Sequence, residues 1–243
     1  MRKIQTIYSV KFTPYKRKNS KINYLLLHYT GMKSEESAIK RLTLSKSKVS
    51  CHYFIKNNGQ IIQMVPDNYI SWHAGNSSWK NKKMLNKISI GIEIQNPGHK
   101  FGYKNFKEIQ IASLKYLLKK LINKFNIKRE NILGHSDVSP NRKKDPGEKF
   151  PWKKLSENKI GVWHNLDDIF LKRLRNKRIK KAQKILFLKF IRKIGYNYDY
   201  HKKGSVNHAV IAFQRRFRPE AITPKIDLEV LEIAKNLVEN KLY

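Results

Sequence analysis

The sequence predicts an α/β fold with a central mixed β-sheet flanked by helices, followed by a small C-terminal three-helix bundle. An apolar run over residues 22–28 and an alternating, β-branched run over 88–94 are typical of strands with buried faces. Residues 106–125 place apolar side chains at helical spacing. Strands that alternate with helices favour a layered α/β arrangement. Strand patterns stop at about residue 165, and three helical stretches follow, at residues 167–194, 205–217 and 227–240.

Two further segments precede the strand at 88–94. Residues 34–46 are polar and compatible with a helix, and Ser34 is a candidate N-cap. Residues 52–65 indicate a β-hairpin, because Asn58 and Gly59 form a strong turn signal between two β-prone runs.

The last strand of the sheet and the domain boundary come next. Residues 131–134 form a short predicted strand that leads into His135. Residues 136–152 contain three prolines and a glycine, which predict an ordered loop. We therefore expect a first domain over residues 1–165 and a helical domain over residues 166–243.

The chain carries 52 Lys and Arg against 18 Asp and Glu, a formal net charge of +34 over 243 residues. Such a field attracts any polyanion, including nucleic acid and anionic lipid. The basic residues are scattered along the whole chain, which favours solvated lysines from a composition bias. Selection for an anionic partner such as the cell wall is the second interpretation. No helix-turn-helix, RNP or zinc-finger pattern supports nucleic-acid binding.

The sequence contains no stretch of the roughly 18 apolar residues that a membrane span needs. Its start has no continuous apolar signal segment and no lipoprotein cysteine. We therefore expect no transmembrane segment. We also expect that the protein stays inside the cell or that its targeting segment is missing from this chain. The single cysteine, Cys51, excludes an intrachain disulfide.

Three residues are candidate metal ligands because rigid elements would hold them. His28 ends the first buried strand, His135 follows the last one, and Asp145 lies in the loop after it. A catalytic zinc takes three such N, O or S ligands and keeps one open position for water. A lone histidine at a strand end is more often structural, however, and spacing alone does not separate His28 from His52 or His73.

Two more residues suit the chemistry around such a metal. Glu93 lies on the strand at 88–94, where a carboxylate can act as general base toward a water. Lys143 precedes Asp145 by two residues and can stabilise a developing oxyanion.

Five ordered motif blocks resemble the AmpD-like N-acetylmuramoyl-L-alanine amidases, which share a fold with bacteriophage T7 lysozyme and the peptidoglycan recognition proteins. The match covers roughly residues 20–155, and the last block is the most specific. The blocks read YLLLHYT, VSCHYFIKNNGQIIQMV, SWHAGNSSW, LNKISIGIEIQNPG and ILGHSDVSPNRKKDPGEKFPW.

The resemblance implies a role for each matching position. His28, His135 and Asp145 match the three zinc ligands of the family. Glu93 matches its catalytic glutamate, and Lys143 matches the basic residue that helps to stabilise the tetrahedral intermediate. The implied cofactor is Zn²⁺.

The chain departs from the T7 lysozyme-like relatives at two points. Their third ligand is a cysteine, whereas Asp145 stands here, as in the AmpD branch. They also place a tyrosine just before the histidine that aligns with His52. Cys51 occupies that position, so the tyrosine's role must fall to Glu93, and His52 itself is expected to be structural.

Three residues near these motifs are candidate substrate contacts. His73 lines the expected cleft or packs locally, Trp79 is a sugar platform or a core residue, and Asn96 touches the glycan or forms a turn. The remaining histidines are expected at the surface, namely His99, His164, His201 and His208.

The C-terminal part is similar to the three-helix peptidoglycan-binding domain, most clearly in AVIAFQRRFRP. AmiD-type envelope amidases pair the same two domains, which favours the cell envelope as the compartment, with the cytoplasm as the alternative. The chain departs from that pattern because it lacks the lipoprotein signal and because residues 219–226 lack the usual glycine.

The resemblance implies hydrolysis of the amide bond between N-acetylmuramic acid, including its 1,6-anhydro form, and L-alanine. The expected partners are peptidoglycan and muropeptides, with no specific nucleic acid, and the expected oligomeric state is a monomer. A non-catalytic peptidoglycan-recognition module is the alternative function.

Overall fold

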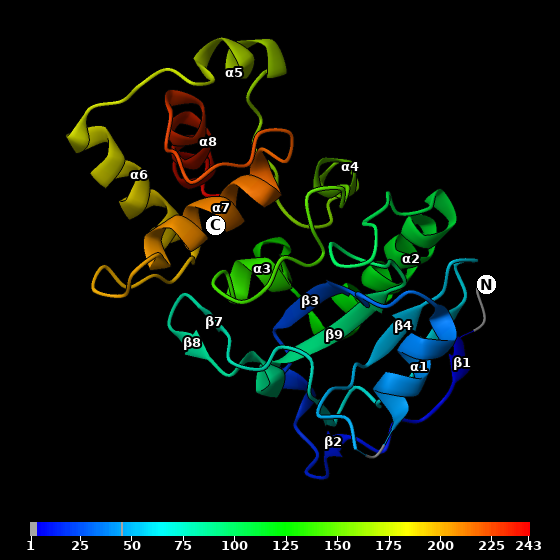
Figure 1. The fold of residues 1–243 in the computed structure, drawn as a ribbon. Coiled ribbons are helices and arrows are strands. Elements are labelled where there is room, and N and C mark those ends of the chain that lie inside the picture. The colour runs from blue at the N-terminus through cyan, green and yellow to red at the C-terminus, as the bar shows by residue number, and fades with distance from the viewer. Residues whose placement is uncertain (1–3, 45) are drawn as a thin grey trace.

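The computed structural model describes residues 4–44 and 46–243 and confirms the predicted α/β class (Figure 1). Within these residues the central sheet has the strand order β1-β5-β4-β9-β3-β10. The pairing of β4 with β5 is antiparallel and the other neighbouring pairs are parallel, so the sheet is mixed. The strands are β1 (Ile4–Thr6), β3 (Tyr24–Tyr29), β4 (Tyr53–Ile55), β5 (Ile61–Gln63), β9 (Ser89–Ile94) and β10 (Ile132–Gly134).

Two short antiparallel ribbons lie beside the sheet. β2 (Phe12–Thr13) pairs with β6 (Ile70–Ser71), and β7 (Ser78–Trp79) pairs with β8 (Lys82–Lys83). The sequence analysis did not anticipate β1 and β2. Their residues are only half-buried or exposed, so they lack the apolar alternation that indicates a strand.

The helices of the N-terminal part cover opposite faces of the sheet. α2 (Glu108–Phe125) packs its apolar side against the face that carries Leu25 and Leu27. α1 (Glu35–Thr43) covers Phe54 and Ile62 on the opposite face. The Ser34 hydroxyl accepts a hydrogen bond from the backbone N–H of Ser37, which confirms the predicted cap. The other short helices are α3 (His135–Val138), α4 (Trp152–Ser156), η1 (Asn19–Lys21), η2 (Leu85–Ile88) and η3 (Arg129–Asn131).

The C-terminal helices are α5 (Asp168–Leu174), α6 (Lys181–Ile194), α7 (Ser205–Phe217) and α8 (Leu228–Glu239). The predicted helical stretch 167–194 is wrong in one respect, because the chain turns between α5 and α6. Asn176 adopts a positive φ of 62° there, and its backbone N–H donates to Asp227 Oδ2 at 3.1 Å. A long-range contact that is invisible in the local pattern therefore ends α5.

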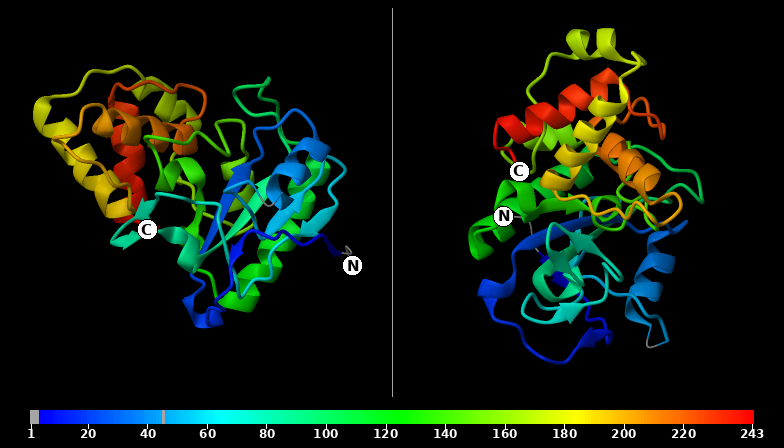
Figure 2. Two further views of the ribbon diagram at one scale, coloured as in Figure 1. Left: turned by 60° about the horizontal axis from the view of Figure 1, so that its bottom comes forward. Right: turned by 90° about the vertical axis from the view of Figure 1, so that its left-hand side faces the viewer.

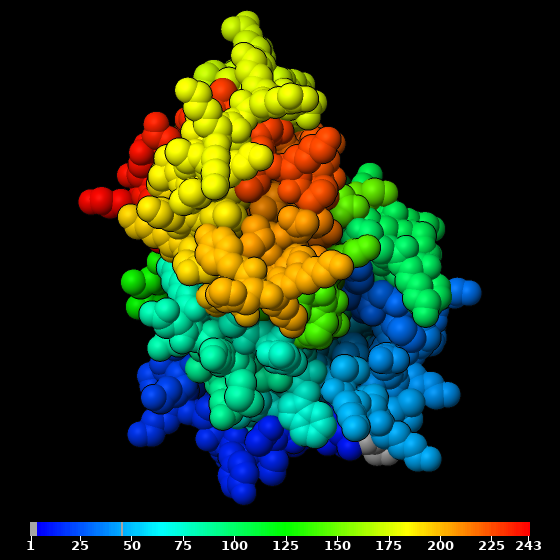
Figure 3. Space-filling model, turned by 60° about the vertical axis from the view of Figure 1, so that its left-hand side comes forward, coloured from blue at the N-terminus to red at the C-terminus, as the bar shows by residue number. Residues whose placement is uncertain are grey.

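The C-terminal helices pack directly on the sheet. Figure 2 shows the two parts side by side, and Figure 3 shows the atoms of the C-terminal helices against those of the N-terminal part. One buried apolar cluster joins Leu26 of β3 and Leu133 of β10 to Phe187, Phe213 and Phe217 of the helices. The predicted boundary at residues 165 and 166 falls in the segment between α4 and α5. The division into two domains stays a prediction. None of the helices in the described part of the chain is long and apolar enough to cross a membrane.

Candidate active site

Strand register brings the first two candidate ligands together. β10 runs parallel to β3 with Gly134 opposite Leu27. His28 follows Leu27 on β3, and His135 follows Gly134 as the first residue of α3, so both reach the same edge of the sheet. Asp145 then returns along the following loop, where its backbone carbonyl accepts a hydrogen bond from Ser136 N–H at 2.8 Å.

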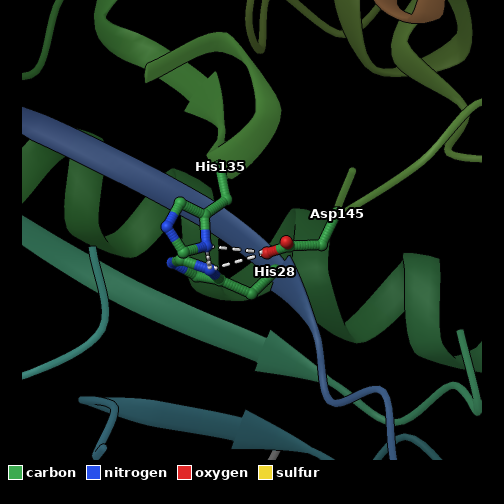
Figure 4. A group of neighbouring side chains, drawn as sticks. All are labelled: His28, His135 and Asp145. Atoms are coloured by element: carbon green, nitrogen blue, oxygen red, sulfur yellow. Dashed lines mark hydrogen bonds and ion pairs between the residues drawn. The ribbon is translucent and has the colours of Figure 1, made fainter. Parts of the chain in front are cut away.

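The three ligand atoms form a small triangle, drawn in Figure 4. His28 Nδ1 lies 2.9 Å from His135 Nδ1 and 2.9 Å from Asp145 Oδ2, and His135 Nδ1 lies 3.0 Å from the same oxygen. All three residues are buried. Tetrahedral zinc with bonds of about 2.0–2.1 Å separates its ligand atoms by about 3.3 Å. The donor set and its spacing therefore fit a divalent metal.

Hydrogen bonds on the far side of each ring orient the two histidines. His135 Nε2 lies 3.0 Å from the carbonyl oxygen of Ala74, which can only accept. The proton of His135 is thus held on Nε2, and the Nδ1 lone pair points into the triangle.

His28 is held by a chain of polar side chains. Its Nε2 lies 3.1 Å from His73 Nδ1, His73 Nε2 lies 3.2 Å from Ser89 Oγ, and that hydroxyl donates to the carbonyl of Leu85 at 2.5 Å. If each group donates to the next, His28 keeps its Nδ1 lone pair free for a metal. A Cβ on Gly91 would lie 2.3 Å from the His73 ring, so this glycine makes room for the chain.

The electrostatics favour the protonation states that a metal requires. Burial, followed by the nearby His135, lowers the pKa of His28 to about 4. Burial also holds the pKa of His73 well below its ordinary value. For Asp145, burial alone would raise the pKa, but His135 and His28 together hold it well below the usual range. At neutral pH the neutral imidazole of His28 and the ionised carboxylate of Asp145 are therefore favoured, and these are the forms that bind metals.

Glu93 lies directly opposite His28 in the parallel pairing of β9 with β3. Its Oε2 atom is buried and finds no hydrogen-bond partner among the described residues. Burial and then repulsion from Asp145 raise its pKa well above the ordinary value, and Lys143 acts in the opposite direction. A cation in the triangle would also favour the ionised form, so Glu93 has the environment of a general base.

A cavity of about 670 Å³ opens beside the triangle. Glu93, His135 and Asp145 lie in its wall, and α1 flanks it. Lys143 also lines it and is half-buried. The rim is basic and partly aromatic, with Arg41, Lys100, Arg142, Lys144, Tyr29, Trp72, His99 and Phe101.

The structure places the three candidate substrate contacts in different environments. His73 lines the cavity but uses both ring nitrogens on His28 and Ser89. Trp79 as a sugar platform is wrong, because its side chain is fully buried against Tyr196 and leaves no face for a sugar. Asn96 is buried outside the cavity wall, where its side chain donates to the carbonyl of Lys104 and accepts from Gly98 N–H. It thus shapes a turn, which was the second interpretation.

Two cavity residues were missed by sequence reasoning as functional positions. Arg142 Nη2 donates to the carbonyls of Ala74 and Asn76, which ties the cavity rim to the loop before β7. His99 is exposed, as expected, but it also lies at the rim, between the hydroxyl of Tyr29 and the carboxylate of Glu148. Arg142 stands in the motif before Asp145, and that position was the available signal.

Residues 18–148 match the family model described as N-acetylmuramoyl-L-alanine amidase. The chain is 33% identical to the N-acetylmuramoyl-L-alanine amidase AmiD of Escherichia coli over 232 residues, which cover 90% of this chain and 83% of AmiD. The chain belongs to the N-acetylmuramoyl-L-alanine amidase family. It is also 36% identical to the 1,6-anhydro-N-acetylmuramyl-L-alanine amidase AmpD of Haemophilus influenzae over 108 residues, 44% of this chain and 56% of AmpD.

Solved structures of the amidase family share the fold. The structure of E. coli AmiD with anhydro-N-acetylmuramic acid-L-Ala-D-γ-Glu-L-Lys superposes with a TM-score of 0.79 at 33% identity and covers 90% of each chain. AmpDh3 from Pseudomonas aeruginosa gives 0.79 at 31% identity and covers 95% of each chain. Both matches extend through the C-terminal helices, so the whole arrangement is one that this amidase family uses.

We expect this amidase to bind a divalent metal with high affinity and His135→Ala to lose it, because two ligands alone hold a metal weakly. Metal content after dialysis, measured by mass spectrometry, tests this. His201→Ala, at an exposed histidine of the helical part, is the control and should retain the metal. Full metal content in His135→Ala would contradict the assignment.

We expect His73→Ala to weaken metal affinity about 10–100-fold, which is the usual effect of losing a residue that orients a metal ligand. Competition with a chromophoric chelator measures the affinity. The expected surface position of His164 is wrong, because its side chain is buried in the segment before α5. His164→Ala is therefore the matched control, since it also removes a buried imidazole. Equal affinities for the two variants would show that His73 does not orient His28.

Proposed function

We propose that this amidase is zinc-dependent and hydrolyses the bond between N-acetylmuramic acid, including the 1,6-anhydro form, and L-alanine in peptidoglycan or muropeptides. The triangle of His28, His135 and Asp145 in a member of this family carries the proposal. The names of the relatives support the substrate class. AmiD was captured with an anhydro-muramyl tripeptide and AmpDh3 with an anhydromuramic pentapeptide.

His28, His135 and Asp145 would hold the zinc, and two imidazoles with one carboxylate are a usual donor set for a catalytic site. Bound zinc would supply an activated water and polarise the scissile carbonyl. Glu93 then takes the proton of the attacking water and passes it to the amine of L-alanine as that group leaves. Burial and then Asp145 raise the pKa of Glu93, and this suits the first half of the transfer because a more basic carboxylate takes up a proton more readily.

The rim of the cavity suits an acidic peptide stem. Lys143 faces the cavity near Asp145 and is placed to neutralise the negative charge that develops on the carbonyl oxygen. Arg41, Lys100 and Lys144 surround the opening. A muropeptide carries free carboxylates on its stem peptide, so this field favours its approach and orientation.

We also propose that residues 166–243 add affinity for the cell wall and that the protein acts as a monomer. The support for wall binding is the similarity of AVIAFQRRFRP to the peptidoglycan-binding domain and the high positive charge. Tethering a second weak binding element raises the effective concentration of substrate at the catalytic site.

Digestion of purified peptidoglycan tests the reaction. We expect products with free stem peptide that begins at L-alanine, identified by mass spectrometry, and no such peptide after removal of the metal with a chelator. Restoring zinc should restore cleavage. Binding to peptidoglycan without any released peptide would instead support the alternative, a recognition module without catalysis.

Glu93→Gln should lower kcat about 10²–10⁴-fold, because the amide cannot accept the proton of the attacking water. The variant should keep its metal and its fold, since Glu93 is not one of the three ligand residues. Glu157→Gln, at an exposed position away from the cavity, is the control, because it also replaces one glutamate by glutamine. Turnover near that of the wild type in Glu93→Gln would refute the base role.

A further inference from the structure

We propose that Arg216 and Tyr196 of the helical part position the metal ligand His135 through Asp137, so that the C-terminal helices belong to the support of the metal centre. This inference rests on the proposed metal site. It concerns a contact between α7 and α3, which lie side by side in Figure 1.

Asp137 is the link between the two parts. It is 1% exposed and stands two residues after His135 in α3, a helix of a single turn. Its Oδ2 atom accepts hydrogen bonds from Gly134 N–H at 2.8 Å and from Arg216 Nη1 at 2.6 Å, and its Oδ1 accepts from the Tyr196 hydroxyl at 2.7 Å. One carboxylate thus joins the end of β10, the ligand-bearing turn and the C-terminal helices.

Arg216 reaches into the amidase part from α7. Its guanidinium is 1% exposed, lies 4.1 Å from the centroid of the Trp152 ring, and donates from Nη2 to the carbonyl of Ile132 at 3.1 Å. A buried guanidinium requires a nearby carboxylate, because the cost of removing its charge from water is high. Asp137 supplies that carboxylate, so the position of each residue is set by the other.

A movement of Asp137 would displace two of the candidate ligands, His135 and Asp145. Gly134 precedes His135 directly, and a Cβ on it would lie 2.7 Å from Pro146 Cδ, next to Asp145. The end of β10 is therefore packed against the residue that follows the third ligand. In a site this tight, the turn cannot shift without moving His135 against Asp145, and metal sites tolerate only a few tenths of an ångström.

The neighbouring Arg215 contacts the other end of the segment that carries His135 and Asp145, residues 135–148. It is 7% exposed, and its Nε lies 3.7 Å from the carboxylate of Glu148, three residues after Asp145. Consecutive arginines of α7 thus contact both ends of residues 135–148, which carry two of the three ligands.

The rival explanation is that Arg216 only stabilises the interface, and Arg218 offers a matched control. Arg218 lies two residues after Arg216 and is 2% exposed. It pairs with Asp227 and Glu229, and all three residues belong to the helical part. Removing either arginine takes the paired arginine away from a buried aspartate, Asp137 in one case and Asp227 in the other. Arg216 alone of this pair contacts the turn that carries His135.

The test measures zinc affinity by chelator competition on the full chain. Arg216→Gln should weaken affinity about 10–100-fold, the usual effect of losing an outer partner of a metal ligand. It should alter the visible spectrum of the Co²⁺-loaded protein and lower kcat more than it raises KM. Arg218→Gln should stay within about twofold of the wild type in affinity and keep the Co²⁺ spectrum, whatever its melting temperature.

A milder pair of variants covers the case in which Arg216→Gln does not fold. Tyr196→Phe removes one donor to Asp137 and keeps the ring packing, and it should weaken zinc affinity in the same direction by a smaller factor. Tyr198→Phe is its control, because the Tyr198 hydroxyl donates to the carbonyl of Leu188 inside the helical part.

The outcomes distinguish a failure of this inference from a failure of the proposed metal site. If the wild type binds zinc and both Arg216→Gln and Tyr196→Phe bind it equally well, the contact is only structural and the inference is overturned. If Arg216→Gln does not fold, Tyr196→Phe alone decides. If the wild type binds no zinc, the proposed metal site fails first, and the positioning role fails with it.

Discussion

The parallel pairing of β3 with β10 determines where the chemistry of this protein takes place. With Gly134 opposite Leu27, the next residue after each is a histidine, His28 on β3 and His135 at the start of α3, and both rings arrive at one edge of the sheet. The pairing of β3 with β9 adds Glu93 beside His28 by the same logic. Because side chains alternate between faces, a shift of one residue in either pairing would turn a ligand or the general base to the other face. The apolar clusters that fix these registers therefore fix the site.

Placing so many polar groups in the interior is costly, and the structure offsets the cost with directed hydrogen bonds. A buried imidazole without partners would destabilise the fold. Here His28, His73 and Ser89 form a chain that ends on the carbonyl of Leu85. The chain also assigns a tautomer to each ring. One set of contacts thus satisfies buried groups and prepares lone pairs for a metal, and its position beside Gly91 explains a small residue in the middle of a buried strand.

The sequence predicted the sheet and the ligands because their signals are local or specific to the family. The apolar run before His28 and the Asn-Gly turn within residues 52–65 indicate strands by themselves. The break between α5 and α6 was not predictable, since the contact between Asn176 and Asp227 spans 51 residues. Trp79 was equally ambiguous, because an aromatic residue beside a cleft has the same pattern whether it faces sugar or packs on Tyr196. Arg216 was hidden in a basic stretch where every arginine looks alike. Arg215 and Arg218 are buried as well, so the long-range contact with Asp137 is what distinguishes Arg216.

Arginines and lysines occupy different positions in the described part of this structure, because some arginines are buried and the lysines are not. Among the described residues the buried charged side chains are arginines and carboxylates, and no lysine is buried. Five of the 18 acidic residues are buried, at positions 67, 137, 145, 227 and 229. Two of these carboxylates have a buried arginine as partner, as Asp137 has Arg216 and Asp227 has Arg218. Four of the described arginines are buried beside these five acids, so the large excess of basic over acidic residues lies outside the interior and gives the surface a strong positive field. Composition bias and selection for an anionic partner are the two interpretations of this excess. Part of it lies at the cavity, where Lys100, Lys143 and Lys144 contribute to the lining and create a local positive field.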